Sequence, residues 1–213
     1  MRTRRYASLL LAVLMALALS ACGEPAQKED ETMSIAPAQL SQEETALTEL
    51  LGLGMENYRI FDYQVGGGVQ SIQLTVYELV GTEWEPKVNA IRSASTDPKG
   101  RIALAFGRMT EGVRVSFQSE NSGGGATFTM ETEDDVSSMA CATSMLTNAA
   151  EIAFDQEVPL VVQIVTSKNQ INSYDVSYFG MPREYAKHEY EHVYAITVTF
   201  SEKAVEELSS PAP

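Results

Sequence analysis

Short segments in which apolar residues occupy every second position dominate the sequence after residue 54. Ile72, Leu74 and Val76, for example, alternate with polar residues, as expected of a strand with one buried face. Similar alternating or short apolar segments occur at 102–106, 113–117, 128–130, 158–166, 171–178 and 190–200. About eight or nine short strands joined by glycine-containing turns are typical of an antiparallel β-sandwich. The pattern therefore predicts a mainly β fold of this class.

Glycine-rich stretches mark the expected connections between these strands. Gly66–Gly68 and Gly123–Gly125 lack the lysine and the following helix of a phosphate-binding loop, so we interpret both as hairpin turns. Leu79–Trp84 has the pattern of a further hairpin turn.

Residues 135–154 are open to two interpretations. Four residues could form the apolar stripe of a helix: Met139, Ala142, Leu146 and Ala149. Alternatively, Thr143–Leu146 is a strand that is followed by a turn at Asn148.

A short helix is predicted to begin after Ser41. Ser41 and Glu44 have the spacing of a capping box, and Gly52 suits a helix end. The apolar residues of this segment, which fall on one face, are Ala46, Leu47, Leu50 and Leu51. We therefore expect a flexible tether over 22–40, a β-sandwich domain with this N-terminal helix over 41–205, and a tail over 206–213.

The N-terminus has the layout of an export signal. Arg2, Arg4 and Arg5 precede the apolar stretch Ala7–Leu19, which is too short to span a bilayer as a helix. The stretch ends in Leu19-Ser20-Ala21-Cys22, which resembles the lipobox of bacterial lipoproteins. The resemblance implies that residues 1–21 are a signal peptide and that Cys22 carries lipid, including palmitate. It implies a protein anchored to the outer face of a bacterial membrane.

The chain contains two cysteines, so lipidation of Cys22 would leave Cys141 without a partner for a disulfide. Met139, Ala140 and Ala142 surround Cys141 with small or apolar side chains. No basic residue stands beside it to stabilise a thiolate. We expect a buried, unreactive thiol.

Charge excludes one class of partner. The formal net charge is −14, and without the three arginines of the leader 12 basic residues face 29 acidic ones. Such a chain is repelled by nucleic acid and by anionic membrane surfaces, so we expect contact with the membrane through the lipid anchor only.

His188-Glu189-Tyr190-Glu191-His192 matches the H-E-x-x-H pattern of zinc metallopeptidases. On a helix, the two histidines would lie one turn apart and could bind one zinc ion, with Glu189 as general base. On a strand, their Cα atoms would lie about 13 Å apart and could not share a metal. The β-branched and aromatic run after His192 favours a strand, so we expect histidines in solvent at its start. We expect neither a metal nor a cofactor.

Five of the nine tyrosines, together with both histidines, fall between residues 174 and 194. Exposed aromatic rings on loops could form a platform for a glycan or a peptide, although some of these rings would pack in the core. The candidate ligand-binding residues are Trp84, Tyr178, Tyr185 and Tyr190.

These features favour a lipid-anchored, extracytoplasmic binding or interaction module over an enzyme. Its partner would be a glycan, a peptide or another envelope protein. One alternative is a zinc-dependent hydrolase that uses His188, Glu189 and His192. A second alternative is a structural accessory subunit of an envelope complex, which an edge strand that pairs with a partner would support.

Overall fold

The computed structural model describes residues 32–51, 58–94 and 97–208, and the chain from Thr32 onward forms one unit. The predicted signal peptide, Cys22 and the first part of the tether lie outside the described residues.

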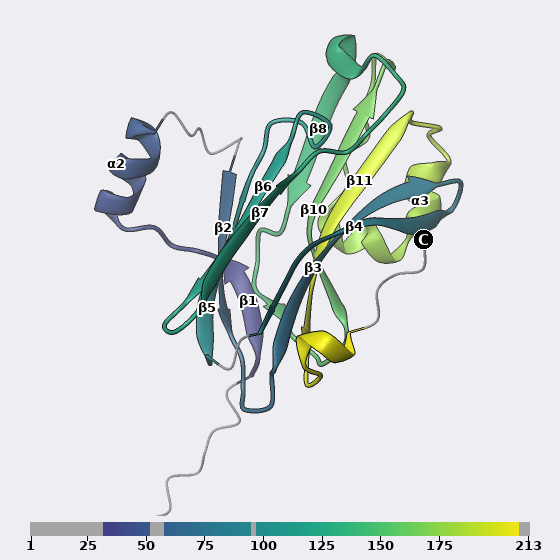
Figure 1. Cartoon of the computed structure of the whole chain (residues 1–213). Helices are drawn as coiled ribbons and strands as arrows, with labels where there is room; N and C mark the ends of the chain where they lie inside the picture. The colour runs from purple at the N-terminus through teal and green to yellow at the C-terminus, as the bar shows by residue number, and fades with distance from the viewer. Residues whose placement is uncertain (1–31, 52–57, 95–96, 209–213) are drawn as a thin grey trace, which may run out of the picture. The chain divides into compact units, whose positions relative to one another are not determined.

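Two antiparallel sheets pack face to face, which confirms the predicted β-sandwich (Figure 1). The six-stranded sheet has the order β7-β6-β5-β2-β1-β9. Its strands are β1 (Ser34–Pro37), β2 (Tyr58–Gln64), β5 (Lys99–Ala105), β6 (Val113–Ser119), β7 (Gly123–Phe128) and β9 (Ala150–Glu151). The five-stranded sheet has the order β4-β3-β11-β10-β8. Its strands are β3 (Ser71–Val80), β4 (Glu83–Ala94), β8 (Ala140–Met145), β10 (Glu157–Thr166) and β11 (His192–Ser201).

The alternating apolar residues form the core between the sheets, as the sequence predicts. Tyr63 of β2 and Phe200 of β11 meet across it, with ring centroids 5.3 Å apart. The predicted hairpin between β3 and β4 is also present. Gly81 stands in its two-residue turn at φ 62°, where residues with a side chain are disfavoured.

Strands β10 and β11 are buried on both faces. The residues that face away from the core, such as Ile164 and Ala195, are 2% and 0% exposed. The segment Ser167–Glu191, which we call the cover segment, packs on this outer face. It contains the 3-10 helix η2 (Val176–Gly180) and the helix α3 (Pro182–Ala186), and Figure 1 shows both helices on the side of this sheet that faces away from the other sheet. Two-sided burial explains the nearly continuous apolar runs of these two strands.

Helix α2 (Gln42–Leu50) begins with the predicted capping box at Ser41 and Glu44. Its polar side holds it to the six-stranded sheet: Glu44 pairs with Arg101, and the Tyr58 hydroxyl donates to Thr48 Oγ1 over 3.0 Å. The predicted apolar face points to solvent instead, with Leu47, Leu50 and Leu51 57%, 82% and 65% exposed.

The tether prediction over 22–40 is wrong for Ser34–Pro37, because these residues form β1 between β2 and β9. Ile35 of β1 is fully buried. A strand of four residues with one buried apolar side chain is too short to show alternation. At the other end, the 3-10 helix η3 (Val205–Glu207) extends into the predicted tail.

For three further segments, the structure either corrects the sequence prediction or decides between its two alternatives. Residues 171–178 are not a strand but part of the cover segment. Gly123–Gly125 are not a turn: they begin β7, where a Cβ on Gly125 would lie 3.1 Å from the Val115 carbonyl oxygen. Within 135–154, the strand alternative is correct, since the short 3-10 helix η1 (Val136–Ser138) leads into β8.

Candidate functional site

The two histidines of the H-E-x-x-H pattern have separate environments. His192 opens β11 and is 8% exposed, with Nδ1 3.2 Å from Glu78 Oε1 and Nε2 3.0 Å from Asp134 Oδ2. The strand interpretation is confirmed for His192, but the expectation of a solvated side chain is wrong, because both ring nitrogens are enclosed by carboxylates. His188 follows α3, and its Nε2 lies 2.7 Å from Tyr174 Oη.

Helix α3 ends at Ala186, so no helix carries the two histidines on one face. Glu189 is exposed and has a positive φ of 51°. Across the described ranges, no group of three or more His, Cys, Asp or Glu residues is placed to hold a metal ion. The geometry that the zinc-hydrolase alternative requires is therefore not formed by these residues.

The predicted aromatic residues meet in one cluster. The Trp84 ring from β4 stacks on Phe179 at 5.0 Å and contacts Tyr185 edge-on at 6.0 Å. Tyr185 contacts Tyr174 at 5.2 Å, and Tyr174 stacks on Tyr178 at 4.8 Å. The cluster thus joins the cover segment to the five-stranded sheet.

Packing accounts for most of this cluster. Tyr185 is 1% exposed, and the Trp84 indole N–H donates to the Phe179 carbonyl over 2.8 Å. Burial raises the pKa of Tyr185, so its phenol stays neutral. Tyr190 stacks on His188 at 5.2 Å, and its hydroxyl accepts from the Asn172 N–H. Tyr178 and Tyr190 are half-buried. The four candidate residues are therefore brought together, but Tyr185 is enclosed by its neighbours.

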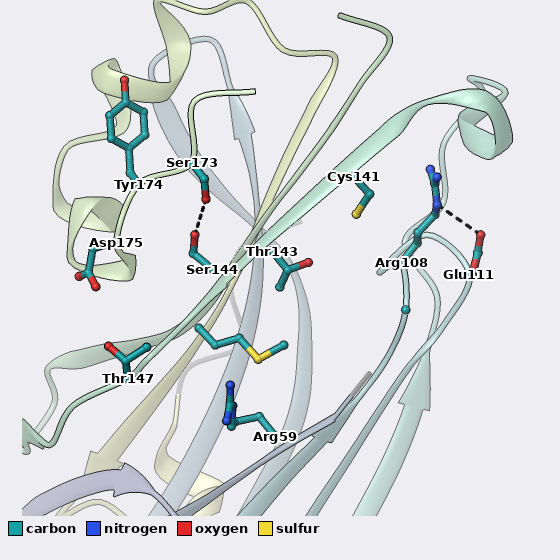
Figure 2. A pocket seen from close by; sticks show the side chains of 12 residues that line it. Arg59, Arg108, Glu111, Cys141, Thr143, Ser144, Thr147, Ser173, Tyr174 and Asp175 are labelled. Carbon is teal, nitrogen blue, oxygen red and sulfur yellow. Dashed lines mark hydrogen bonds and ion pairs between the residues drawn. The ribbon is translucent and has the colours of Figure 1, made fainter. Parts of the chain in front are cut away.

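A cavity of about 870 Å³ lies beside β8 (Figure 2), and Trp84 is not among the residues that line it. It is lined by residues of β8, by Arg59 of β2, by the loop between β5 and β6, and by the cover segment. The side chains that bear on its chemistry are Arg59, Arg108, Glu111, Cys141, Thr143, Ser144, Ser173, Tyr174 and Asp175.

The cavity lies where two strands lack a neighbour among the residues that the structure describes. Strand β8 is the last strand of its sheet and, in the described ranges, pairs only with β10. Strand β1 pairs with Phe61–Gln64 of β2, so the Arg59 end of β2 extends beyond it. The sheets are therefore open to each other between β8 and Arg59.

Arg59 is the charged group of this cavity with no partner in the described chain. It shares the inward face of β2 with the buried Phe61 and Tyr63, and its Nε is buried without a hydrogen bond to any described residue. Arg108, in contrast, donates to the carbonyls of Val136 and Met139 over 2.7 and 2.6 Å and lies 3.6 Å from Glu111.

Cys141 lies on β8 and lines the cavity, so the prediction of a buried thiol is wrong. Its small neighbours suggested a core position, but they stand on an edge strand. Desolvation raises the pKa of Cys141, which keeps the thiol protonated at neutral pH. The nearby hydroxyls are ordered: Ser144 and Ser173 Oγ are 2.7 Å apart, and Thr143 accepts from Gln163.

Gln163 of β10 lies in the core and holds one wall of the cavity in place. It is fully buried; its Oε1 accepts from the Met109 N–H over 2.8 Å, and its Nε2 donates to the Gly107 carbonyl over 2.9 Å. Neither Gln163 nor Arg59 is predicted from the sequence as a site residue. A signal was present for each: Gln163 interrupts an apolar run, and Arg59 occupies the register of Phe61 and Tyr63.

Comparison with protein-family models, curated proteins and solved structures finds no match to this chain. In the part of the chain that the structure describes, no helix is long and apolar enough to cross a bilayer.

Proposed function

We propose that this chain is a lipid-anchored extracytoplasmic protein whose sandwich domain binds a ligand in the cavity beside β8. The observation that carries the proposal is the inward-facing Arg59, which lines a cavity of about 870 Å³ and whose Nε is buried without a partner among the described residues. This volume is within the range of about 300–1,000 Å³ that is common for ligand sites.

An unpartnered buried donor lowers stability by about 1–3 kcal/mol, and more when it is charged. A ligand that accepts from Arg59 would remove this penalty on binding. Thr143, Ser144 and Ser173 supply hydroxyls that could hold polar groups of the same ligand.

Only part of the predicted aromatic platform lies near the proposed binding site. Tyr174 lines the cavity and stacks on Tyr178, so these two rings could contact a ligand. Trp84 and Tyr185 are part of the packing behind them.

Ligand binding can be tested by ligand-observed NMR with the full chain in detergent and a library of short peptides, glycans and small carboxylates. We expect hits that are lost in Arg59→Met and retained in Arg114→Met, a matched change of an exposed arginine on β6. Hits that survive Arg59→Met would contradict the proposed site.

The lipid anchor needs its own test, because Cys22 lies outside the described residues. Cells that express the full chain should incorporate labelled palmitate into it, and Cys22→Ser should abolish the label. Label that persists in Cys22→Ser would disprove this anchor.

The alternative of an accessory subunit is favoured by one observation. Strand β8 leaves a sheet edge unpaired within the described residues, and such an edge can pair with a strand of another protein.

A further inference from the structure

Within the described part of the chain, the unpaired edge of β8 lacks the usual protection of edge strands. Proteins generally block such edges with charges, proline, bulges or covering segments, because the free backbone groups can pair with another chain. Strand β8 has the sequence ACATSM, with no charge and no proline. Its register with β10 runs from Met145 to Ala140 without a bulge.

The β8 edge borders the cavity. Residues 141 and 143–145 of β8 all line it, and Arg59 lies at another side of the same space (Figure 2). A segment laid along β8 would therefore run through the cavity and pass the Arg59 guanidinium. The cavity also has the polar wall that an extended peptide requires, with Thr143, Ser144 and Ser173.

Charge indicates what this segment carries. Arg59 offers a planar set of donors that matches a carboxylate, and no acidic group of the described chain pairs with it. Arg108, at the other end of β8, already uses its Nη atoms on two carbonyls. Arg59 is thus the position at which an acidic group of a ligand can be bound.

We propose that β8 accepts an extended peptide of another envelope protein as an added strand, and that Arg59 binds a carboxylate of this peptide. The inference rests on the proposed function, since it names the ligand class of the same cavity. The carboxylate comes from an acidic side chain or from the C-terminus of the peptide. A second copy of this chain is a poorer occupant, because two chains that each carry a strongly negative net charge repel one another.

Cys141 provides the readout. It lies on β8, and a strand added there would cover its thiol. The rate of Cys141 alkylation by iodoacetamide, followed by peptide mass spectrometry of the full chain in detergent, therefore reports occupancy. Peptide mapping separates Cys141 from Cys22 whether or not Cys22 carries lipid.

The probe is an acetylated and amidated peptide of about seven residues, near the usual strand length, in which valine alternates with serine or threonine around one central glutamate. We expect it to slow alkylation, and we expect its glutamine analogue to need at least a tenfold higher concentration. Arg59→Met should remove this difference, while Arg114→Met should keep it. Binding through a C-terminal carboxylate is tested in the same way, by comparing the glutamine peptide with an amidated C-terminus and with a free C-terminal carboxylate.

Backbone pairing is tested on the peptide, so that the protein fold is not disturbed. Only alternate N–H groups of an added strand point toward its neighbour. We expect N-methylation of one alternate set to abolish protection and N-methylation of the other set to retain it.

Several results would overturn strand addition. They are equal protection by the glutamate and glutamine peptides, equal effects of the two N-methylated sets, or protection by acetate or phosphate that matches the peptide. A dimer in sedimentation whose formation protects Cys141 would assign the edge to a second copy instead. If no peptide protects Cys141 but NMR hits still depend on Arg59, only this inference fails; if those hits are also absent, the proposed function fails with it.

Discussion

Arg59 and Gln163 both point into the space between the sheets, but they use their donors differently. Every polar atom of the Gln163 amide has a partner, and these bonds link β10 to the loop between β5 and β6. The Nε of Arg59 has none in the described chain. A buried polar group that is satisfied supports the fold, whereas one that is unsatisfied lowers stability.

Arg59→Met should therefore stabilise the protein without ligand, by about 1 kcal/mol, because methionine fills similar space without an unpaired donor. The check is the urea midpoint of the variant against the wild type, with Arg114→Met as a control that should change little. A clear loss of stability in Arg59→Met would show that Arg59 has a structural role in the free protein.

Gln163→Leu should destabilise the protein by about 2–4 kcal/mol, since it leaves the Met109 N–H and the Gly107 carbonyl without partners. Chemical denaturation measures this change. Gln118→Leu, at an exposed position of β6, should leave the free energy of unfolding nearly unchanged. Equal effects at both positions would mean that the Gln163 bonds contribute little.

The sequence predicts the strand that begins at His192 but not the side chains that surround this histidine. The strand assignment of His192 followed from the β-branched run after it, but its enclosure by Glu78 and Asp134 depends on contacts across 114 and 58 positions of sequence. Arg59 of β2 and the residues of β8 likewise line one cavity although they are far apart in the sequence. A single sequence does not show which distant strands become neighbours, so the cavity could not be predicted.

At the scale of elements, α2 depends on an ionised Glu44. Hydrogen bonds from the Ser41 N–H, then Arg101 and the Ser41 hydroxyl, lower the pKa of Glu44 to about 2. A carboxyl with a lowered pKa in the folded state stabilises that state above its unfolded pKa, near 4.5, and loses this effect as the pH falls toward 2.

The attachment of α2 should therefore weaken between about pH 4.5 and pH 2, while the sandwich keeps its own contacts. NMR shifts of the Leu47 and Leu50 amides would follow it. Glu44→Gln should weaken the attachment already at neutral pH, and Glu43→Gln, in the same helical turn, serves as the control. Unchanged Leu47 and Leu50 shifts in Glu44→Gln would contradict this role.

The cover segment depends on Tyr185. Tyr185→Ala should cost about 3–5 kcal/mol, the usual loss for a large buried aromatic residue. Tyr185→Phe should be neutral or slightly stabilising, because the hydroxyl is buried and no described residue bonds to it. Trp84 is the only tryptophan and contacts Tyr185, so a red shift of its emission in Tyr185→Ala would report the loosened segment. An unchanged emission spectrum would argue against this contact in solution.

Elements with strong alternation or caps were predictable from sequence, and the others were not. Strands β3, β5, β6, β10 and β11 and helix α2 carry their own local signals. Strand β1 has one buried apolar residue, and β7 begins with three glycines that usually mark turns. Residues 171–178 have apolar residues at strand-like intervals but cover a sheet that is already complete, so tertiary packing decided their conformation.

For the whole molecule, the start of the domain is the clearest correction. A chain that begins at Thr32 should fold with the stability of the wild type, whereas one that begins at Ser41 lacks β1 and should lose at least about 2 kcal/mol. The reason is the burial of Ile35 and the pairing of β1 with both β2 and β9. Thermal denaturation of both chains shows whether the domain begins before or after β1. Equal midpoints would support the predicted tether over 22–40.

The position of β11 constrains the order in which this chain can acquire its structure. The last strand in the sequence lies between β3 and β10, at the centre of its sheet, and β3 is more than 100 positions away from it. Until residue 201 is available, β3 can pair with β4 and β10 with β8, but each lacks its second neighbour, and the cover segment has no completed sheet to pack on. The five-stranded sheet of a growing chain is therefore incomplete until β11 has been made, and a copy that terminates before β11 cannot form it.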